Sequence, residues 1–198
     1  MKTICIFGDS VTWGRGLKKR TAWVNLLRDY LEDKDERIHL YDLGIDGNAT
    51  VDVIDRFSVE SKSRKPDVVV WAIGTNDSAY KKTLDNPVAS KDEFAKNLER
   101  LYQQAGGANT SQLFVGIAKG IDTNTKPLPE STTGKCYEKA RVAEYDLIIR
   151  EIAQKNSTAY VNISDSLVDE DFYDGLHPNE RGHMKMFLKL QPEIEKLI

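Results

Sequence analysis

Residues 68–73 read Val-Val-Val-Trp-Ala-Ile, a continuous apolar run that begins just after Pro66. A strand with one face in water would alternate apolar and polar residues, so an unbroken run indicates a strand covered on both faces. Such strands are typical of parallel sheets that carry helices on either side. This single run therefore favours an α/β fold.

Four further segments have the character of strands, and helical patterns separate them. The expected strands are residues 3–7, 38–43, 67–73, 112–117 and 159–163. Apolar residues recur at helical spacing in five segments: residues 21–33, Val51 to Phe57 (capped by Asn48 or Thr50), Phe94 to Tyr102, Tyr137 to Ile152, and Asn179 to the C-terminus. Five β-α repeats predict a three-layer α/β/α sandwich around a five-stranded parallel sheet. With no linker or internal repeat, residues 1–198 are expected to form one domain.

Charge and apolar content exclude several classes of partner. Lys and Arg total 28 against 31 Asp and Glu, a net charge of −3, so no basic field predicts nucleic-acid binding. No segment approaches the ~18 apolar residues of a membrane span. The N-terminal apolar run is shorter than the roughly 7–15 residues of a signal-peptide core. Oligomeric state is not indicated by any pattern.

Cys5 and Cys136 are the only cysteines, and Cys5 falls in an expected buried strand. Two free thiols are therefore expected rather than a disulfide, which favours a cytoplasmic protein. A secreted form that has lost its signal stays open.

Polar or glycine clusters follow four of the five expected strands. They read Gly8-Asp9-Ser10, Gly44-Ile45-Asp46-Gly47-Asn48, Gly74-Thr75-Asn76-Asp77 and Asp174-Gly175-Leu176-His177-Pro178-Asn179. Each cluster alone is common turn chemistry. The carboxyl ends of parallel strands meet at one edge of the sheet, where ligands bind in open α/β folds. Their recurrence at that edge predicts a functional site.

These clusters resemble the four sequence blocks of the SGNH (GDSL-type) hydrolase family, in the family's order and spacing. Together they span residues 8–179. The resemblance implies a flavodoxin-like SGNH topology and a serine esterase. Val11 stands where family members often have Leu, and Asp42 stands where the second block often has Asn; neither departure touches the residues with expected chemistry.

The resemblance implies a catalytic triad of Ser10, His177 and Asp174. A serine hydroxyl is a weak nucleophile until a base accepts its proton, and a neutral imidazole can do so near neutral pH. Asp174, three residues before His177, can accept from the other ring nitrogen and fix the tautomer.

An oxyanion hole is implied at the backbone N–H of Ser10, the backbone N–H of Gly47 and the side-chain amide of Asn76. Such donors must already point at the position where negative charge develops. Asp9 and Asp77 are expected to brace these loops through backbone N–H groups. His39 and His183 are expected to be structural or solvated.

The expected reaction is two-step hydrolysis of a carboxylic ester or thioester through an acyl-Ser10 intermediate, with no metal and no organic cofactor. The loops at residues 13–19, 78–90 and 119–135 are expected to shape the substrate site. Trp13, Tyr80, Phe172 and Tyr173 are the candidate substrate contacts. Because these loops hold aromatics but no long apolar run, a short-acyl esterase or deacetylase is favoured.

Other functions stay open on the sequence alone. A lipolytic enzyme for longer acyl chains, such as a thioesterase or lysophospholipase, would use the same site, as would an acyltransferase or a non-catalytic acyl-binding protein. A Mg²⁺-dependent phosphatase could use Asp9, Asp77 and Asp174, because acidic residues suit hard cations. A nucleotide-binding module is disfavoured because neither G-x-x-x-x-G-K-[ST] nor G-x-G-x-x-G is present.

Overall fold

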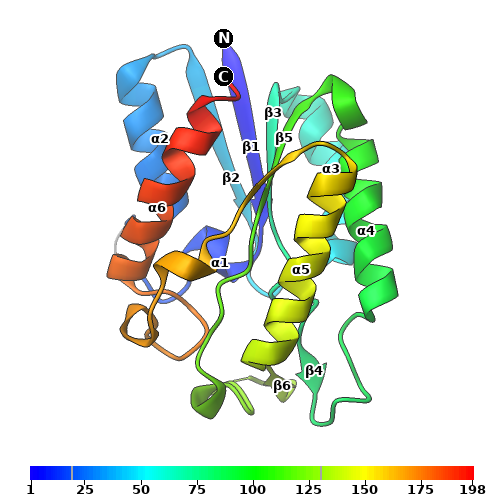
Figure 1. Cartoon of the computed structure of the whole chain (residues 1–198). Helices are drawn as coiled ribbons and strands as arrows, with labels where there is room; N and C mark the ends of the chain where they lie inside the picture. Colours follow the sequence, from blue (N-terminus) through cyan, green and yellow to red (C-terminus); the bar gives the residue numbers. More distant parts are fainter. Residues whose placement is uncertain (19, 130) are drawn as a thin grey trace.

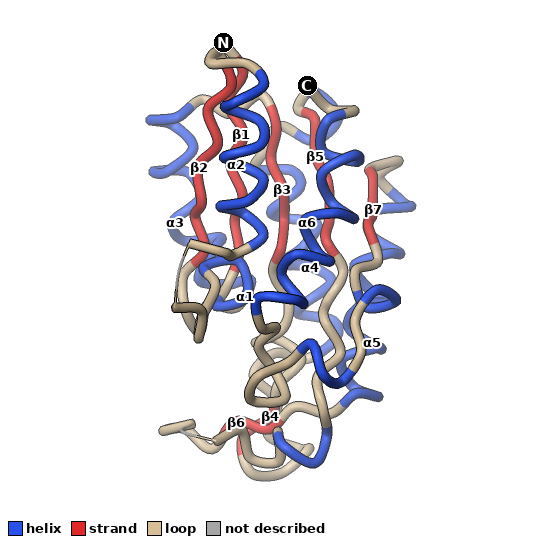
Figure 2. The backbone as a smooth tube through the Cα atoms, turned by 90° about the vertical axis from the view of Figure 1, so that its left-hand side faces the viewer, coloured by secondary structure: helices blue, strands red, loops and turns tan. Residues whose placement is uncertain are grey.

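The computed structural model describes residues 1–18, 20–129 and 131–198, and it confirms the α/β/α sandwich (Figures 1 and 2). All neighbouring strands of the central sheet are parallel, in the order β2-β1-β3-β5-β7. The strands are β1 (Lys2–Gly8), β2 (Ile38–Gly44), β3 (Val68–Ala72), β5 (Ser111–Val115) and β7 (Ala159–Val161). Each of the five expected strands is present, within two residues at either end.

Helices cover both faces of the sheet (Figure 1). One face packs against α2 (Trp23–Lys34) and α6 (Glu180–Glu195). The other packs against α3 (Thr50–Arg64), α4 (Lys91–Gln104) and α5 (Lys139–Lys155). A four-residue helix α1 (Ser10–Trp13) and a separate two-stranded ribbon of β4 (Tyr80–Lys81) and β6 (Lys135–Cys136) lie beyond the carboxyl ends of the strands.

The apolar run in β3 contributes side chains to both halves of the core. Val68 and Val70 belong to the cluster under α2 and α6, whereas Val69 and Trp71 belong to the cluster under α3, α4 and α5. The indole nitrogen of Trp71 donates to Oε1 of Gln112 (2.8 Å), so this buried donor is satisfied. Burial on both faces is the physical reason that β3 lacks polar alternation.

The start of α3 differs from the sequence-based expectation. The helix begins at Thr50 with Ala49 at its N-cap, so neither Asn48 nor Thr50 caps it. Both side chains are committed to tertiary contacts: Asn48 Oδ1 accepts from Arg56, and Thr50 Oγ1 donates to Asp77. Val51 is exposed, which corrects its placement on the buried face of this helix.

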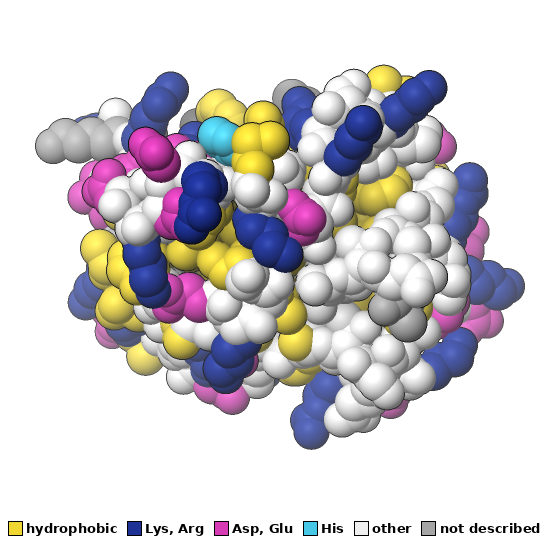
Figure 3. Space-filling view, turned by 90° about the horizontal axis from the view of Figure 1, so that it is seen from above, with side chains coloured by type: hydrophobic (Ala, Val, Ile, Leu, Met, Phe, Trp, Pro, Cys, Tyr) yellow, Lys and Arg dark blue, Asp and Glu magenta, His cyan; other side chains and the backbone are white. Residues whose placement is uncertain are grey.

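Both cysteines are free, as expected, and both are buried. Burial raises the pKa of the Cys5 thiol to about 12. Within the described ranges, no helix is long and apolar enough to cross a membrane. Figure 3 views the end of the molecule that carries both termini, where acidic and basic side chains are interspersed.

Glycines at the strand ends let α1 approach the sheet closely. Gly8, the last residue of β1, pairs with Gly44 of β2 and with Ala72 of β3. A Cβ on Gly8 would lie 2.0 Å from Thr12 Oγ1 and 2.7 Å from the carbonyl oxygen of Ala72. The missing side chain therefore allows the chain to turn directly from β1 into α1.

Replacing Gly8 by alanine should destabilise the fold. The new methyl group would overlap a backbone carbonyl that cannot move without disturbing β3, and overpacking of this kind costs about 1–3 kcal/mol. Urea unfolding of Gly8→Ala measures the loss in free energy of unfolding. Ser58→Ala, on the exposed side of α3, serves as the control; equal unfolding free energies for the two variants would contradict the close approach.

Candidate active site

Ser10 lies at the turn that joins β1 to α1. Asp9 is the N-cap of α1, and its Oδ1 accepts a hydrogen bond from the backbone N–H of Val11 (2.9 Å). This cap satisfies an N–H group that the short helix leaves without a partner and fixes where the helix begins. Ser10 is thereby held as the first helical residue, beyond the end of the central β1 strand.

Ser10, His177 and Asp174 form one chain of hydrogen bonds. Ser10 Oγ lies 2.9 Å from His177 Nε2, and His177 Nδ1 lies 2.7 Å from Asp174 Oδ2. Both Ser10 and the imidazole are buried, at 4% and 3% exposure. The residues come from opposite ends of the chain: Ser10 follows β1, whereas the other two occupy the loop before α6.

The protonation of this chain follows from Asp174. Burial alone would raise its pKa, but hydrogen bonds from the His177 ring and from the backbone N–H groups of His177 and Leu176 outweigh burial and lower the pKa to about 2. An ionised carboxylate only accepts, so Nδ1 of His177 carries the hydrogen in this contact. Nε2 is then free to accept the Ser10 proton, which makes Ser10 a candidate nucleophile.

Three hydrogen-bond donors lie around the same cavity as Ser10. Gly47 has φ +81°, a left-handed conformation that favours glycine, and no protein atom lies within 4 Å of where its Cβ would be. Among the described residues, the backbone N–H groups of Ser10 and Gly47 have no hydrogen-bond acceptor. Asn76 supplies the third donor, its side-chain amide. Such a set can receive an oxyanion.

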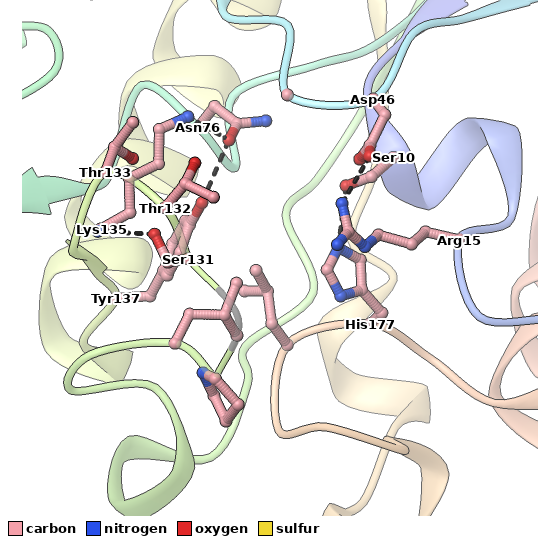
Figure 4. A pocket seen from close by; sticks show the side chains of 14 residues that line it. Ser10, Arg15, Asp46, Asn76, Ser131, Thr132, Thr133, Lys135, Tyr137 and His177 are labelled. Carbon is pink, nitrogen blue, oxygen red and sulfur yellow. Dashed lines mark hydrogen bonds and ion pairs between the residues drawn. The ribbon is translucent and has the colours of Figure 1, made fainter.

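The amide of Asn76 is oriented by contacts on both sides. Its Oδ1 accepts from Lys135 Nζ (2.9 Å) and from the hydroxyl of Tyr137 (3.0 Å). Its Nδ2 donates to the carbonyl oxygen of Asn48 (3.0 Å). Figure 4 shows the oxygen turned toward Lys135 and Tyr137 and the nitrogen turned toward the Ser10 side of the cavity.

Asp9 and Asp77 accept backbone N–H bonds that hold the loops of the site in place, as the sequence indicated. Asp77 accepts from the backbone N–H of Thr50 (3.1 and 3.0 Å) and from its hydroxyl (2.5 Å), which ties the loop after β3 to the start of α3. Burial raises the pKa of Asp77 to about 6, although the bonds from Thr50 oppose the shift. Burial likewise raises the pKa of Asp9 to about 6, against the bond from Val11.

The donors and Ser10 open onto a cavity of about 370 Å³ (Figure 4). Most of the residues that line it have polar side chains, but apolar atoms contribute as much of the lining surface as polar atoms do. The polar residues include Arg15 and Asp46, which form an ion pair at 2.5 Å, and three residues with hydroxyl groups, Ser131, Thr132 and Thr133. The apolar lining residues are Leu128, Pro129 and Leu176. The cavity therefore offers hydrogen-bonding groups together with a small apolar surface from these three residues.

The four aromatic residues expected to contact substrate are not among the residues that line this cavity. Phe172 belongs to the core under α2 and α6, and Tyr80 is buried with its hydroxyl donating to Glu138 (2.9 Å). Trp13 is exposed, and Tyr173 stacks on the His177 ring at 5.8 Å between centroids. Two of the four are therefore buried in the protein interior, where apolar side chains leave water, and the other two are exposed.

The residues that form the cavity wall opposite Ser10 were not predicted from the sequence. Lys135 ends the loop of residues 119–135, and only that loop's position after the fourth strand indicated a role at the site. Tyr137 was expected at the start of the fourth helix, but α5 begins only at Lys139. Arg15 and Asp46 were likewise not assigned. Lys19 and Glu130, which fall in two loops expected to shape the substrate site, lie outside the described residues.

The three carboxylates considered for a metal site point to different partners. Asp9 accepts from Val11, Asp77 from Thr50, and Asp174 from His177. Nowhere in residues 1–18, 20–129 and 131–198 do three His, Cys, Asp or Glu side chains group so that they could hold a metal ion. The other two histidines do not belong to the hydrogen-bonded chain of Ser10: His39 is exposed on β2, and Nδ1 of the buried His183 accepts from Trp23 N (3.2 Å).

Residues 6–185 match the model of the GDSL-like Lipase/Acylhydrolase family. The chain belongs to this family. The match includes every residue of the hydrogen-bonded chain and of the three-donor set, and membership places the chain among the serine ester hydrolases.

A curated relative extends the comparison. The chain is 33% identical over 128 residues to the uncharacterized lipoprotein YqeF of Bacillus subtilis, a match that covers 62% of this chain and 51% of that protein. The chain thus spans about half the length of this relative.

Solved structures share the fold at low sequence identity. A lipase/acylhydrolase from Enterococcus faecalis has a TM-score of 0.79 at 22% identity, with 99% of this chain and 96% of that chain covered. A catalytic mutant of Axe2, an acetylxylan esterase from Geobacillus stearothermophilus, has a TM-score of 0.77 at 18% identity, covering 98% and 94%. The psychrotrophic esterase EstA from Pseudoalteromonas sp. has a TM-score of 0.76 at 20% identity, covering 99% and 98%.

Replacing Asp9 by asparagine should change how stability depends on pH. The folded-state pKa of about 6 lies above the ~3.9 of an unfolded aspartate, so the folded wild type binds more protons in this window and loses stability as pH rises through it. Asparagine keeps an acceptor for Val11 and does not ionise. The free energy of unfolding of Asp9→Asn, relative to that of wild type, should therefore increase by about 1–3 kcal/mol from pH ~4 to ~7.

Urea unfolding at several pH values across this window measures the difference. Asp55→Asn, at an exposed position of α3, is the matched control. Its free energy of unfolding should differ from that of wild type by the same amount at every pH. If the difference between Asp9→Asn and wild type also did not change with pH, the raised pKa of Asp9 would be contradicted.

Proposed function

We propose that the protein hydrolyses short-acyl carboxylic esters, acetyl esters foremost, through an acyl-Ser10 intermediate. The observation that carries this proposal is the hydrogen-bonded chain from Ser10 through His177 to Asp174, which opens onto a polar cavity of about 370 Å³.

In the first step, Ser10 Oγ attacks the acyl carbonyl carbon while His177 Nε2 accepts the hydroxyl proton. The carbonyl oxygen becomes an oxyanion that accepts hydrogen bonds from Ser10 N–H, Gly47 N–H and the Asn76 amide. His177 then donates its proton to the leaving alkoxide, the bond to the alcohol breaks, and the acyl group remains on Ser10. Asp174 stays ionised throughout and stabilises the transient imidazolium.

In the second step, water attacks the acyl carbon and gives its proton to His177 Nε2. The second oxyanion collapses, the bond to Ser10 Oγ breaks, and His177 returns the proton to that oxygen. The carboxylic acid leaves and the enzyme is restored. A thioester would follow the same steps with a thiolate as leaving group.

The preference for a short acyl group rests on the lining of the cavity. Each buried methylene of an acyl chain gains about 0.8 kcal/mol only where apolar surface receives it. Apart from Leu128, Pro129 and Leu176, the lining offers hydroxyl, amide and charged groups, which suit a polar alcohol such as a sugar. The shared fold with an acetylxylan esterase supports the same substrate class.

Ser10→Ala should abolish turnover. Loss of the nucleophile in a triad typically lowers kcat by about 10⁴-fold or more. Hydrolysis of p-nitrophenyl acetate gives kcat, and a fluorophosphonate probe should label the wild type on Ser10 but not the variant. Thr133→Ala, another hydroxyl of the cavity, is the control and should keep the label.

An unlabelled wild type would favour an acyl-binding protein over a hydrolase. Loss of activity on treatment with a chelator would instead favour metal-dependent chemistry and contradict the acyl-Ser10 route.

Activity should fall as the acyl chain lengthens. A series of p-nitrophenyl esters from acetyl to palmitoyl, together with an acetylated sugar, measures kcat/KM against chain length. We expect the maximum at acetyl or propionyl, because longer chains would leave methylenes against polar walls. A maximum at lauroyl or longer would replace this proposal with a lipase, thioesterase or lysophospholipase activity.

A further inference from the structure

We propose that Lys135, supported by Tyr137, is a positioning residue that aims the Asn76 amide at the oxyanion and strengthens it as a donor. The proposal rests on the proposed function, because it takes Asn76 as an oxyanion donor. It adds to that site two side chains that reach it from a different part of the chain, the ribbon of β4 and β6 and the residue that follows it.

The chemistry of lysine settles which end of the amide faces it. An ammonium group donates hydrogen bonds and accepts none, so the Asn76 atom 2.9 Å from Lys135 Nζ must be the oxygen. The nitrogen is thereby turned the other way, toward Asn48 and the Ser10 side of the cavity (Figure 4). Of its two hydrogens, one is donated to the carbonyl of Asn48 at 3.0 Å, which leaves the second for a ligand.

A flipped amide would be strongly disfavoured. It would bring the NH₂ group against Lys135 Nζ and the carbonyl oxygen of Asn76 against that of Asn48, so donors would face donors and acceptors would face acceptors. In a residue as buried as Asn76, each unpaired polar group carries its full desolvation cost. The oxyanion donor is therefore oriented before substrate arrives, which is what electrostatic stabilisation of a transition state requires.

The charge of Lys135 also acts on the amide itself. A cation that donates to the amide oxygen draws electron density from the nitrogen, so the N–H on the far side becomes a stronger donor. Lys135 is half-buried, and no carboxylate among the described residues lies within ion-pair distance of its ammonium. Burial lowers the pKa of Lys135, with repulsion from Lys81 as a smaller cause. Its ammonium group therefore contacts the Asn76 amide oxygen and not a counter-ion.

The scaffold that carries Lys135 and Tyr137 is fixed at several points. Lys135 pairs with Lys81 across the ribbon, and its backbone N–H donates to Ser131 Oγ (2.9 Å). Tyr137 is held on both sides by Thr125, whose carbonyl accepts from Tyr137 N (3.0 Å) and whose hydroxyl donates to Tyr137 O (2.7 Å). These anchors make the position of both donors independent of substrate.

A double-mutant cycle tests the proposal with p-nitrophenyl acetate as substrate. Asn76→Ala should lower kcat by about 10²–10³-fold, the usual cost of one oxyanion donor. Lys135→Met, which keeps the length of the side chain but not its charge, should lower kcat by about 10–100-fold with KM changed less than about threefold. In the Asn76→Ala background the same change should lower kcat by less than about threefold, because the group through which Lys135 acts is gone.

Two conservative variants and one control complete the cycle. Lys135→Arg keeps a cationic donor and should retain more activity than Lys135→Met, whereas Tyr137→Phe removes only the hydroxyl and should lower kcat by about 3–10-fold, again only when Asn76 is present. Lys96→Met, at an exposed position of α4, should leave kcat and KM unchanged. Urea unfolding confirms that each variant is folded.

Equal losses from Lys135→Met with and without Asn76, or a loss confined to KM, would overturn the proposal. The first would mean that Lys135 acts independently of Asn76, and the second would make it a ground-state substrate contact. Fluorophosphonate labelling of Ser10 in the wild type separates this failure from failure of the proposed function, since a labelled Ser10 with an additive cycle contradicts only the role of Lys135.

Discussion

The hydrogen bond between Ser10 and His177 joins residues 167 positions apart, and the rest of the site depends on it. It can form because β1 is a central strand whose carboxyl end turns directly into α1, while the loop before α6 returns to the same edge of the sheet. Glycines at the ends of β1 and β2 let that turn approach the sheet closely. Parallel topology thus brings distant segments to one edge, where their side chains act together.

Buried charged groups hold this edge in place at some cost to stability. The carboxyl groups of Asp9 and Asp77 lie in surroundings that raise their pKa to about 6, yet each accepts backbone N–H bonds that fix the loops carrying Ser10 and Gly47. Asp174 is the opposite case, since its hydrogen bonds keep it ionised. Strained or desolvated groups of this kind are characteristic of sites where geometry matters more than stability.

Local patterns in the chain were sufficient to predict the sheet and the residues that lie around Ser10. Unbroken apolar runs predicted strands buried on both faces. The four polar clusters contain Ser10, Gly47, Asn76 and His177, which line one cavity, and Asp174, which contacts His177. The errors have a common cause. Val51 and the cap of α3 were assigned from residue type and spacing, whereas tertiary packing and tertiary hydrogen bonds decided where those side chains lie.

The sequence alone determined the fold class and the order of the strands along the chain, and it supplied the candidates for nucleophile, base and oxyanion donors, because apolar runs and short motifs encode them locally. Only the tertiary structure showed which side chains form the opposite wall. Lys135 and Tyr137 reach Asn76 across about 60 residues of chain through a ribbon of two residues per strand. A strand of two residues is too short to show a hydrophobic periodicity in the sequence. Packing, rather than local sequence, therefore decides which residues it contacts.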